Sequence, residues 1–359
     1  MITLPQLLKV MLEYKASDMH LSAGSPPSFR VFGSISRAKL TALTGSETKE
    51  LCYSVLTEAQ KAQFEEKRQI DLSFGVRELG RFRVNIFYQR GTISGAFRYI
   101  PFEIPKLATL GLPTVINSLI MKPKGLILVT GTTGCGKSTT LASLVNELNE
   151  TQRLHVITIE DPIEYIHSHS KSLINQREIG GDAISYPDAV KAALREDPDV
   201  VLIGEMRDRE TMETALTLAE TGHLVFSTLH TNGAYQTINR IVQAFPADYQ
   251  EQVRLQLSLV LEGILSQVLL EKADKKGRAL AIELMVANNS IRNLIRENKI
   301  FQIPSAMRAG QNTTGMITLN QSLMSLVAER FVTCEKALEA SPDAEELTKM
   351  IVAFEREAS

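Results

Sequence analysis

Apolar residues repeat with two different spacings along the first hundred positions. Residues 5–15 have the spacing of an amphipathic helix. One side of that helix would carry Leu7, Leu8, Met11 and Leu12. Residues 27–38 and 80–100 instead alternate, are rich in valine, isoleucine and aromatic residues, and contain glycine, which is typical of antiparallel strands. Because residues 46–66 between them have a helical pattern, we expect a small α+β domain that ends near residue 100.

Prolines punctuate residues 101–123, which follow this domain. The four prolines are Pro101, Pro105, Pro113 and Pro123. A short apolar helix is expected in the middle of the segment. Proline spacing of this kind marks a domain junction, so we expect a linker here and a place for a hinge.

From residue 124 the pattern changes to short apolar strands that alternate with amphipathic helices. Strands are expected at 125–131, 154–161, 199–205 and 223–230, and helices at 138–150, 188–196 and 208–222. Such alternation predicts a parallel sheet covered by helices, which is the α/β class. From about residue 247 onward we expect mostly helices and a polar tail. The predicted domains are therefore 1–100 and 124–359, joined by 101–123.

Composition and charge narrow the classes of partner. Lysine and arginine total 39 against 41 acidic residues, a net charge of −2, so nothing in the total suggests nucleic acid binding. The start of the chain lacks the basic-then-apolar order of a signal peptide. No run of about 18 apolar residues predicts a membrane span. Any work at a membrane would be done from its surface, through partners.

The cysteines favour a reducing, cytosolic setting. Cys52, Cys135 and Cys334 are far apart, and the chain contains no C-x-x-C pair. A zinc site and a disulfide framework are therefore not expected.

Residues 131–138 read G-x-x-x-x-G-K-S between a predicted strand and a predicted helix. Backbone N–H groups of such a loop cradle phosphates, Lys137 would reach the β- and γ-phosphates, and Ser138 would bind Mg²⁺. The nucleotide-binding candidates are Gly131, Thr132, Thr133, Gly134, Cys135, Gly136, Lys137, Ser138 and Thr139. Because a helix N-terminus and Lys137 are close in sequence, we expect Cys135 to be a reactive thiol that points toward solvent or the interdomain cleft.

Acidic residues follow two of the predicted strands, where ligand sites of parallel sheets gather. The stretch ITIEDPIEY contains Glu160, Asp161 and Glu164, and VVLIGEMRD contains Glu205. Hydrolysis of a nucleotide needs carboxylates that hold Mg²⁺ and orient water. Acidic residues also cap strands and helices for purely structural reasons, and the first group is the weaker signal.

A third predicted strand lies in TGHLVFSTLHTN. Its polar end contains Thr228, His230, Thr231 and Asn232, which could contact a γ-phosphate, and His223 stands at its start. A single histidine is more often structural than functional, so the pattern alone favours neither histidine as a functional residue.

These stretches, in this order and spacing, resemble the secretion ATPase superfamily, whose Walker A, Asp box, Walker B and His box they match. ASDMHLSAG near the start, with SIRNLIRENKIFQI and GMITLNQSL near the end, extends the resemblance over nearly the whole chain. The chain is most similar to the type IV pilus retraction branch. Its short length and its lack of C-x-x-C pairs favour that branch over the assembly ATPases.

The resemblance implies a hexameric motor that hydrolyses ATP with Mg²⁺ to drive pilus retraction and twitching motility. Each subunit would have a PAS-like N-terminal domain and a RecA-like P-loop ATPase domain with C-terminal helices. The ring would lie in the cytoplasm, at the inner face of the cytoplasmic membrane. Its partners would be an inner-membrane pilus platform protein and a paralogous retraction ATPase, with no nucleic acid.

Roles for individual residues follow from the same resemblance. Glu164 would orient the attacking water and Glu205 would support the metal, although these two roles could be exchanged. His230 and Thr221 would relay the nucleotide state across a subunit contact. A cationic group supplied in trans would assist hydrolysis. The candidates are Arg83 and Arg98, together with the other arginines of RELGRFR, Arg77 and Arg81.

The chain departs from the family pattern at three places. Thr132 replaces a usual proline, Cys135 replaces a usual serine, and SIRNLIRE replaces AIRNLIRE. We expect ATP binding to survive the first two changes. Arg292 and Arg296 lie off the apolar face of the SIRNLIRE helix, and the resemblance implies that this segment is needed for retraction.

Three alternatives stay open. A RecA-like motor that acts on nucleic acid would be a different enzyme, and an adaptor that binds nucleotide as a switch would not be an enzyme at all. Within the family, the chain could be a retraction paralogue or another secretion or assembly ATPase.

Overall fold

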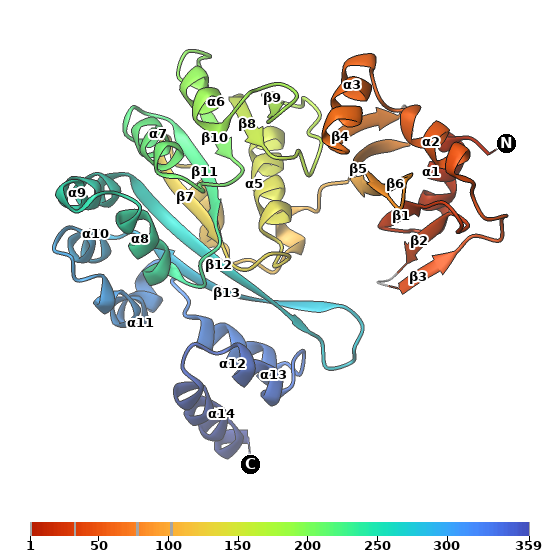
Figure 1. Cartoon of the computed structure of the whole chain (residues 1–359). Coiled ribbons are helices and arrows are strands. Elements are labelled where there is room, and N and C mark those ends of the chain that lie inside the picture. Colours follow the sequence, from red (N-terminus) through yellow and green to blue (C-terminus); the bar gives the residue numbers. More distant parts are fainter. Residues whose placement is uncertain (1, 32–33, 77–78, 101–102, 359) are drawn as a thin grey trace. The chain divides into compact units, whose positions relative to one another are not determined.

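The computed structural model describes residues 2–31, 34–76, 79–100 and 103–358, which divide into two compact units (Figure 1). The first unit comprises the chain up to Glu103 together with Glu164–Ile166, and the second comprises Ile104–Ile163 and His167–Ser359. Residues 104–123, expected as a linker, are part of the second unit. Arg77 and Pro101, which the sequence singled out, lie outside the described residues.

An antiparallel sheet with helices forms the first unit. Its strand order is β3-β2-β1-β6-β5-β4. The strands are β1 (Asp18–Leu21), β2 (Ser28–Val31), β3 (Ser34–Arg37), β4 (Gln69–Val76), β5 (Gly80–Gln89) and β6 (Thr92–Ile100), and the helices are α1 (Leu4–Glu13), α2 (Gly45–Tyr53) and α3 (Glu58–Lys67). On β5 the alternate residues Phe82, Val84 and Ile86 are fully buried, and the apolar side of α1 packs in the same core. The alternation in the sequence therefore predicted the strands within 27–38 and 80–100, whereas β1 and β4 were not expected.

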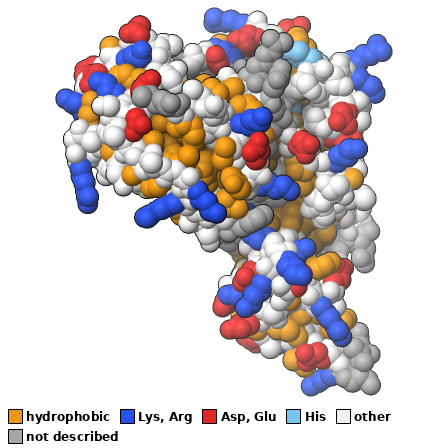
Figure 2. All heavy atoms as spheres, turned by 90° about the vertical axis from the view of Figure 1, so that its right-hand side faces the viewer, with side chains coloured by type: hydrophobic (Ala, Val, Ile, Leu, Met, Phe, Trp, Pro, Cys, Tyr) orange, Lys and Arg blue, Asp and Glu red, His pale blue; other side chains and the backbone are white. Residues whose placement is uncertain are grey.

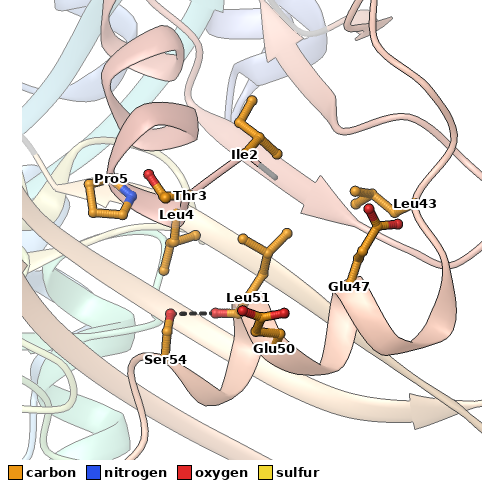
Figure 3. Close-up of a pocket in the computed structure, with 9 residues that line it drawn as sticks. All are labelled: Ile2, Thr3, Leu4, Pro5, Leu43, Glu47, Glu50, Leu51 and Ser54. Carbon is orange, nitrogen blue, oxygen red and sulfur yellow. Dashed lines mark hydrogen bonds between the residues drawn. The ribbon is translucent and has the colours of Figure 1, made fainter.

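A small apolar pocket of about 200 Å³ lies in the first unit, between the start of α1 and α2 (Figure 3). Leu4, Leu43 and Leu51 are among its lining residues, and Ser54 at its floor donates a hydrogen bond to the carbonyl of Leu51. No residue of the nucleotide motifs lines this pocket.

The second unit contains a seven-stranded sheet in the order β13-β12-β7-β11-β10-β8-β9. Its first five strands in sequence are parallel neighbours: β7 (Gly125–Thr130), β8 (His155–Glu160), β9 (Leu173–Glu178), β10 (Val200–Ile203) and β11 (Leu224–Leu229). Buried apolar residues line both faces of this sheet. The alternation of strands and helices thus gave the α/β class, because each connecting helix returns the chain to start another parallel strand.

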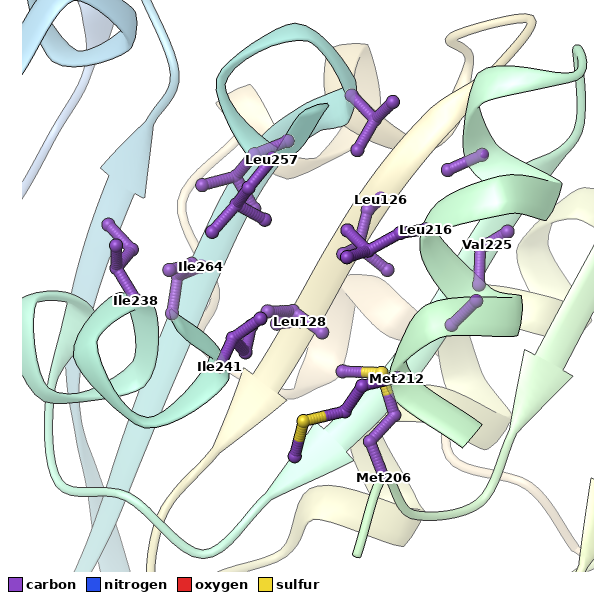
Figure 4. Packing of buried hydrophobic residues seen from close by; sticks show 14 of the residues in the cluster. Leu126, Leu128, Met206, Met212, Leu216, Val225, Ile238, Ile241, Leu257 and Ile264 are labelled. Carbon is purple, nitrogen blue, oxygen red and sulfur yellow. The ribbon is translucent and has the colours of Figure 1, made fainter. Parts of the chain in front are cut away.

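Helices cover both faces of the sheet. They are η1 (Leu107–Thr109), α4 (Val115–Ile120), α5 (Lys137–Thr151), α6 (Tyr186–Ala193), α7 (Arg209–Glu220), α8 (Ala234–Gln243), η2 (Ala247–Tyr249) and α9 (Gln250–Val260). Helices α4 and α5 pack on one face, and α6 to α9 pack on the other. Figure 4 shows part of the second layer, where Leu128 of β7 lies near Ile241 of α8 and Met212 of α7. These layers fix the strand ends that carry the nucleotide motifs.

The expectation of mostly helical structure after residue 247 is wrong for residues 261–286. These form a hairpin of β12 (Leu261–Glu271) and β13 (Arg278–Val286), and β12 pairs in parallel with β7. Because β12 is buried on both faces, its apolar run lacks the alternation by which a strand is recognised.

The rest of the chain is helical. It contains α10 (Asn289–Arg296), η3 (Ile300–Gln302), α11 (Ile303–Thr314), α12 (Leu319–Ala328), α13 (Cys334–Ala340) and α14 (Ala344–Ala358). Leu323 of α12 and Leu347 of α14 pack with Leu270 of the hairpin in a small separate core. No helix among the described residues is both long enough and apolar enough to cross a bilayer.

Candidate nucleotide site

Four adjacent parallel strands of the second unit end at one edge of the sheet, and the sequence motifs follow them. In spatial order these strands are β7, β11, β10 and β8. Gly131 follows β7, His230 follows β11, Glu205 follows β10, and Glu160 ends β8. The carboxyl ends of parallel strands are where α/β sheets bind ligands. The structure therefore brings Walker A, Walker B and the His box together.

The loop between β7 and α5 has the backbone of a phosphate cradle. Gly131 and Gly136 have φ angles of 135° and 96°, which side-chain-bearing residues rarely adopt. At Gly131 a Cβ would lie 2.4 Å from the carbonyl oxygen of Gln267 on β12, so the loop lies directly against that strand. Thr132, Thr133 and Gly134 are exposed, and α5 begins at Lys137.

Lys137 folds back over this loop. Its Nζ donates hydrogen bonds to the carbonyl oxygens of Gly131, at 2.8 Å, and Thr132, at 3.0 Å. Burial lowers the pKa of Lys137, while Cys135 and Glu205 act in the opposite direction. A buried ammonium beside a helix N-terminus and exposed loop amides fits a polyphosphate. Ser138, in the first turn of α5, is exposed and so accessible to a metal ion bound to that phosphate.

The expectation that the Cys135 side chain points toward solvent is wrong. The residue is only 3% exposed, and its Sγ fills the space 2.6 Å from where a Cβ on Gly131 would lie. Burial raises the pKa of Cys135, and the positive charge of Lys137 offsets only part of that effect.

Glu205 lies between two partners, Arg207 from the same strand end and His230 from the end of the neighbouring strand β11. Its Oε2 accepts a hydrogen bond from Nε of Arg207 at 2.8 Å, and its Oε1 is 3.2 Å from Nε2 of His230. The hydrogen bond to Glu205 raises the pKa of Arg207. The Glu205 side chain is 17% exposed, whereas His230 is exposed.

Glu160 is held at the end of β8. Its Oε1 accepts hydrogen bonds from Oγ1 of Thr158 at 2.7 Å and from Nε2 of Gln176 at 3.3 Å. Tyr186, which the sequence did not single out, packs nearby. A Cβ on Gly204 would lie 2.8 Å from its hydroxyl, and burial, Asp161 and Glu160 raise the pKa of Tyr186.

Glu164 belongs to a different unit from the strand-end group. It is exposed, in the loop that connects β8 to β9, and it is part of the first unit. Lys137, Glu205 and His230 all belong to the second unit.

The structure separates Thr221 from His230. Thr221 lies before β11, where its Oγ1 is 3.2 Å from Nδ1 of His223, whereas His230 follows the end of the strand. A six-residue strand is about 20 Å long, so the two residues are not in direct contact. At the His230 end, Thr228 donates to the carbonyl of Gly204 at 2.6 Å and thereby joins β11 to β10. Thr231 bonds to Thr237 of α8 at 2.7 Å, and Asn232 is exposed.

Arg83 and Arg98 lie in the first unit, directly opposite each other on β5 and β6. Nε of Arg98 donates to Asp18 at 2.9 Å. Burial tends to raise the pKa of Asp18, but hydrogen bonds from Ser17 and Arg98 outweigh it and hold that pKa below its usual value. Arg98 is therefore already engaged in an ion pair.

Two residues of the β12–β13 hairpin, which the sequence did not single out, contact the phosphate loop and the helix α5 that follows it. Arg278 of β13 donates to the carbonyl of Gly134 at 3.3 Å, and Gln267 of β12 donates to Oγ1 of Thr140 at 2.8 Å. Both contacts depend on the pairing of β12 with β7. Only the polar sequence KADKKG before Arg278, which suits a turn, could have signalled this hairpin.

The chain is similar to known proteins over nearly its full length. A family model described as Type II/IV secretion system protein matches residues 106–349. "Type IV pilus retractation ATPase PilT" of Pseudomonas aeruginosa is 46% identical over 334 residues, which cover 93% of this chain and 96% of that protein. "Type IV pilus ATPase PilU" of the same organism is 40% identical and covers 96% of this chain and 90% of that protein. A crystal structure of the pilus retraction motor PilT with bound ADP is 52% identical, with a TM-score of 0.92 over 97% of this chain and 100% of that one.

Proposed function

This chain belongs to the Type II/IV secretion system protein family, and on that premise we propose that it is the ATPase motor that retracts type IV pili. The likeness to PilT of P. aeruginosa along both proteins carries this proposal. A likeness confined to residues 124–230 would support only nucleotide hydrolysis. The match also includes the first unit and the C-terminal helices, which supports the same mechanical task, retraction and twitching motility.

The residues of the second unit would divide the work of ATP hydrolysis. Lys137 and the loop amides would hold the phosphates, and Ser138 would hold Mg²⁺, with Glu205 supporting the metal and its water. When bound, Mg-ATP supplies the phosphoryl group and the charge that the metal neutralises. His230 would read the state of the γ-phosphate and pass it to Glu205, its neighbour at 3.2 Å.

Glu164 would orient the attacking water, and its role and that of Glu205 could be exchanged. Substitution by glutamine separates the two roles, because it keeps the shape and removes the charge. If Glu164 is the base, Glu164→Gln lowers turnover while the affinity for Mg-ATP stays the same. If Glu205 supports the metal, Glu205→Gln also raises the Mg²⁺ concentration needed for half-maximal turnover.

The primary test is phosphate release by the purified protein. Lys137→Ala and Glu205→Ala should each lower turnover at least about a hundredfold, as expected for loss of a transition-state electrostatic partner. Glu210→Ala is a matched control. Glu210 is also an acidic residue and lies soon after β10 in the chain, but it forms an ion pair with the exposed Lys191. Turnover within twofold of the parent in either site variant contradicts the role of that residue.

We further propose that the active unit is a homohexameric ring in which a neighbouring first unit supplies an arginine. Arg83 is the first candidate, because Arg98 is bound to Asp18. Mixing Arg83→Ala subunits with Lys137→Ala subunits tests this: mixed rings contain some sites with both residues, so activity should recover. A mixture no more active than its components argues that Arg83 does not act in trans.

In cells the ring would act at the inner face of the cytoplasmic membrane, on an inner-membrane platform protein and together with a paralogous ATPase. A gene deletion separates the possible roles. Abundant pili that do not retract, and loss of twitching, support retraction. Absent pili would indicate an assembly motor, and unchanged twitching would indicate a paralogue with an auxiliary role.

A motor that acts on nucleic acid is the less favoured alternative. Lysine, arginine and acidic side chains are interspersed on the face drawn in Figure 2, rather than separated into a basic stripe. Stimulation of turnover by DNA would support that alternative.

A further inference from the structure

Glu283, in the middle of β13, contacts the first residues of two helices. Its Oε1 accepts a hydrogen bond of 2.7 Å from the backbone N–H of Ala234, the first residue of α8. Burial raises the pKa of Glu283, and the backbone N–H groups of Ala234 and of Leu319, the first residue of α12, act on this carboxylate in the opposite direction. Figure 1 shows β13 between these two helices, which belong to different layers of the second unit.

Glu283 does for α8 what a capping side chain usually does. The N-cap residue of α8 is Gly233, which has no side chain with which to accept a hydrogen bond. A Cβ at Gly233 would lie 3.1 Å from Oε1 of Glu283 and 2.5 Å from the side chain of Gln236, so glycine leaves room for the carboxylate. When Glu283 is ionised, both helix dipoles favour its negative charge and so offset part of the cost of burying it.

The sheet places Glu283 at the level of the nucleotide motifs. Leu229 of β11 is opposite Thr130 of β7, Thr130 is opposite Ser266 of β12, and Ser266 is opposite Glu283. The phosphate loop and His230 begin one residue beyond this row. Neighbouring strands are about 4.8 Å apart, so three spacings separate Glu283 from β11.

The loop that carries His230 is anchored at both ends. His230 is 3.2 Å from Glu205, and four residues later Ala234 is bound to Glu283. Between them, Thr231 bonds to Thr237 of α8. A movement of His230 must therefore be absorbed within Thr231–Gly233 or transmitted to α8.

We propose that Glu283 is a positioning residue: it fixes the start of α8, and with it the reach of His230, and it transmits the position of α8 to α12. This inference rests on the proposed ATPase function for its effect on turnover. Its mechanical part, the bridge between two helices, is independent of that function. Loss of the bridge leaves two helix N–H groups without their acceptor.

The experiment compares Glu283→Ala, which removes both acceptors, with Glu283→Gln, which keeps one acceptor oxygen. Glu262→Gln is the matched control, because Glu262 is on the same hairpin but its partners are Arg292 and Lys122. The readouts are kcat and KM for ATP, and amide hydrogen exchange at 232–238 and 319–324, without nucleotide and with Mg-ADP.

We expect Glu283→Ala to lower kcat at least about tenfold, with KM within about twofold, because a misplaced His230 affects the reacting state more than binding. Glu283→Gln should lose about threefold, and the control should keep kcat. Mg-ADP should slow exchange at the starts of both helices in the parent, but only at the start of α8 in Glu283→Ala. The inference is overturned if Glu283→Ala has the kcat of the parent. It is also overturned if Mg-ADP slows exchange at the start of α12 in Glu283→Ala, or fails to slow it there in the parent.

Two further outcomes are also decisive. If the parent hydrolyses no ATP, the proposed function fails, but Glu283→Ala must still exchange faster at both helix starts without nucleotide, and unchanged exchange at either start overturns the bridge. If Glu283→Ala does not fold, Glu283→Gln takes its place. The inference is overturned if Glu283→Gln has the kcat of the parent and Mg-ADP slows exchange at the start of α12 as it does in the parent.

Discussion

Oε1 of Glu205 and Nε2 of His230 lie 3.2 Å apart at the ends of the neighbouring strands β10 and β11. The other oxygen of the same carboxylate accepts from Arg207. A bound group that attracts His230 would weaken the contact between His230 and Glu205. The Glu205 carboxylate would then be held mainly by Arg207. One carboxylate thus joins the Walker B strand to the His box.

The two histidines that flank β11 should differ in their effect on turnover. His230→Gln removes the partner of Glu205 and should lower ATP turnover about tenfold or more. His223→Gln should leave it within about twofold, because His223 bonds to the carbonyl of Leu218 at the other end of the strand. Phosphate-release assays on both proteins test this, and equal losses in the two variants would contradict it.

Arg292 and Arg296 should not behave alike, although both stand off the apolar face of α10. The guanidinium of Arg292 donates to the carbonyls of Ser258 and Leu259 and to Glu262, whereas Arg296 is exposed and bonds to Asn293. We expect Arg292→Ala to lower the free energy of unfolding by about 2–3 kcal/mol, by leaving Glu262 without this partner. Arg296→Ala should change it by less than about 0.5 kcal/mol.

Denaturant titration measures this difference, and it changes how a retraction defect is assigned. Because Arg292→Ala is expected to be less stable, a retraction defect in that variant could reflect unfolding. Arg296→Ala is therefore the variant in which a loss of retraction with normal ATP hydrolysis can be assigned to the motor. If Arg292→Ala is as stable as the parent, its contacts with α9 are not stabilising, and both arginines become valid probes.

The three cysteines should react with N-ethylmaleimide in the order of their exposure. Cys334 is exposed, while Cys52 and Cys135 are buried, and burial raises the pKa of Cys52 to about 12. Mass mapping after brief treatment of the folded protein should therefore find label at Cys334 and almost none at Cys135. The Cys334→Ser variant should keep its ATPase activity under that treatment; rapid inactivation of this variant would instead indicate that the phosphate loop opens.

His167 should make the protein sensitive to mild acid. The imidazole of His167 is buried, and burial lowers its pKa to about 4, whereas the pKa of a histidine in an unfolded chain is about 6.5. Between these values the unfolded state binds a proton that the folded state does not, so stability falls as pH decreases from 6.5 toward 4. From pH 7.5 to pH 5 this one group should remove about 2 kcal/mol.

Comparison with His167→Gln isolates that contribution, because all other titrating groups are shared. Urea titrations at pH 7.5 and pH 5 should show a smaller loss of stability in the variant. An equal loss in both proteins would mean that His167 is protonated or exposed in the folded state.

Local motifs made much of the nucleotide site predictable. The positions of Lys137 and Glu205 follow from short segments in which a strand, a turn and a helix are adjacent in sequence. What could not be predicted depends on distant pairing. Gln267 and Arg278 reach the loop region across 127 and 144 positions, and the backbone of Gln267 lies directly against Gly131. The resemblance gave Thr221 and His230 a joint role, although the whole of β11 separates them.

The position of β12 also determines where the chain can be cut. A fragment of residues 104–247 would contain every Walker and box motif, yet β7 would become an edge strand with an unpaired row of backbone groups. Gly131 would lose the neighbouring carbonyl of Gln267, and Thr140 would lose its hydrogen bond from the same side chain. A fragment that keeps these contacts with the phosphate loop must therefore extend beyond the last nucleotide motif and include the hairpin of β12 and β13.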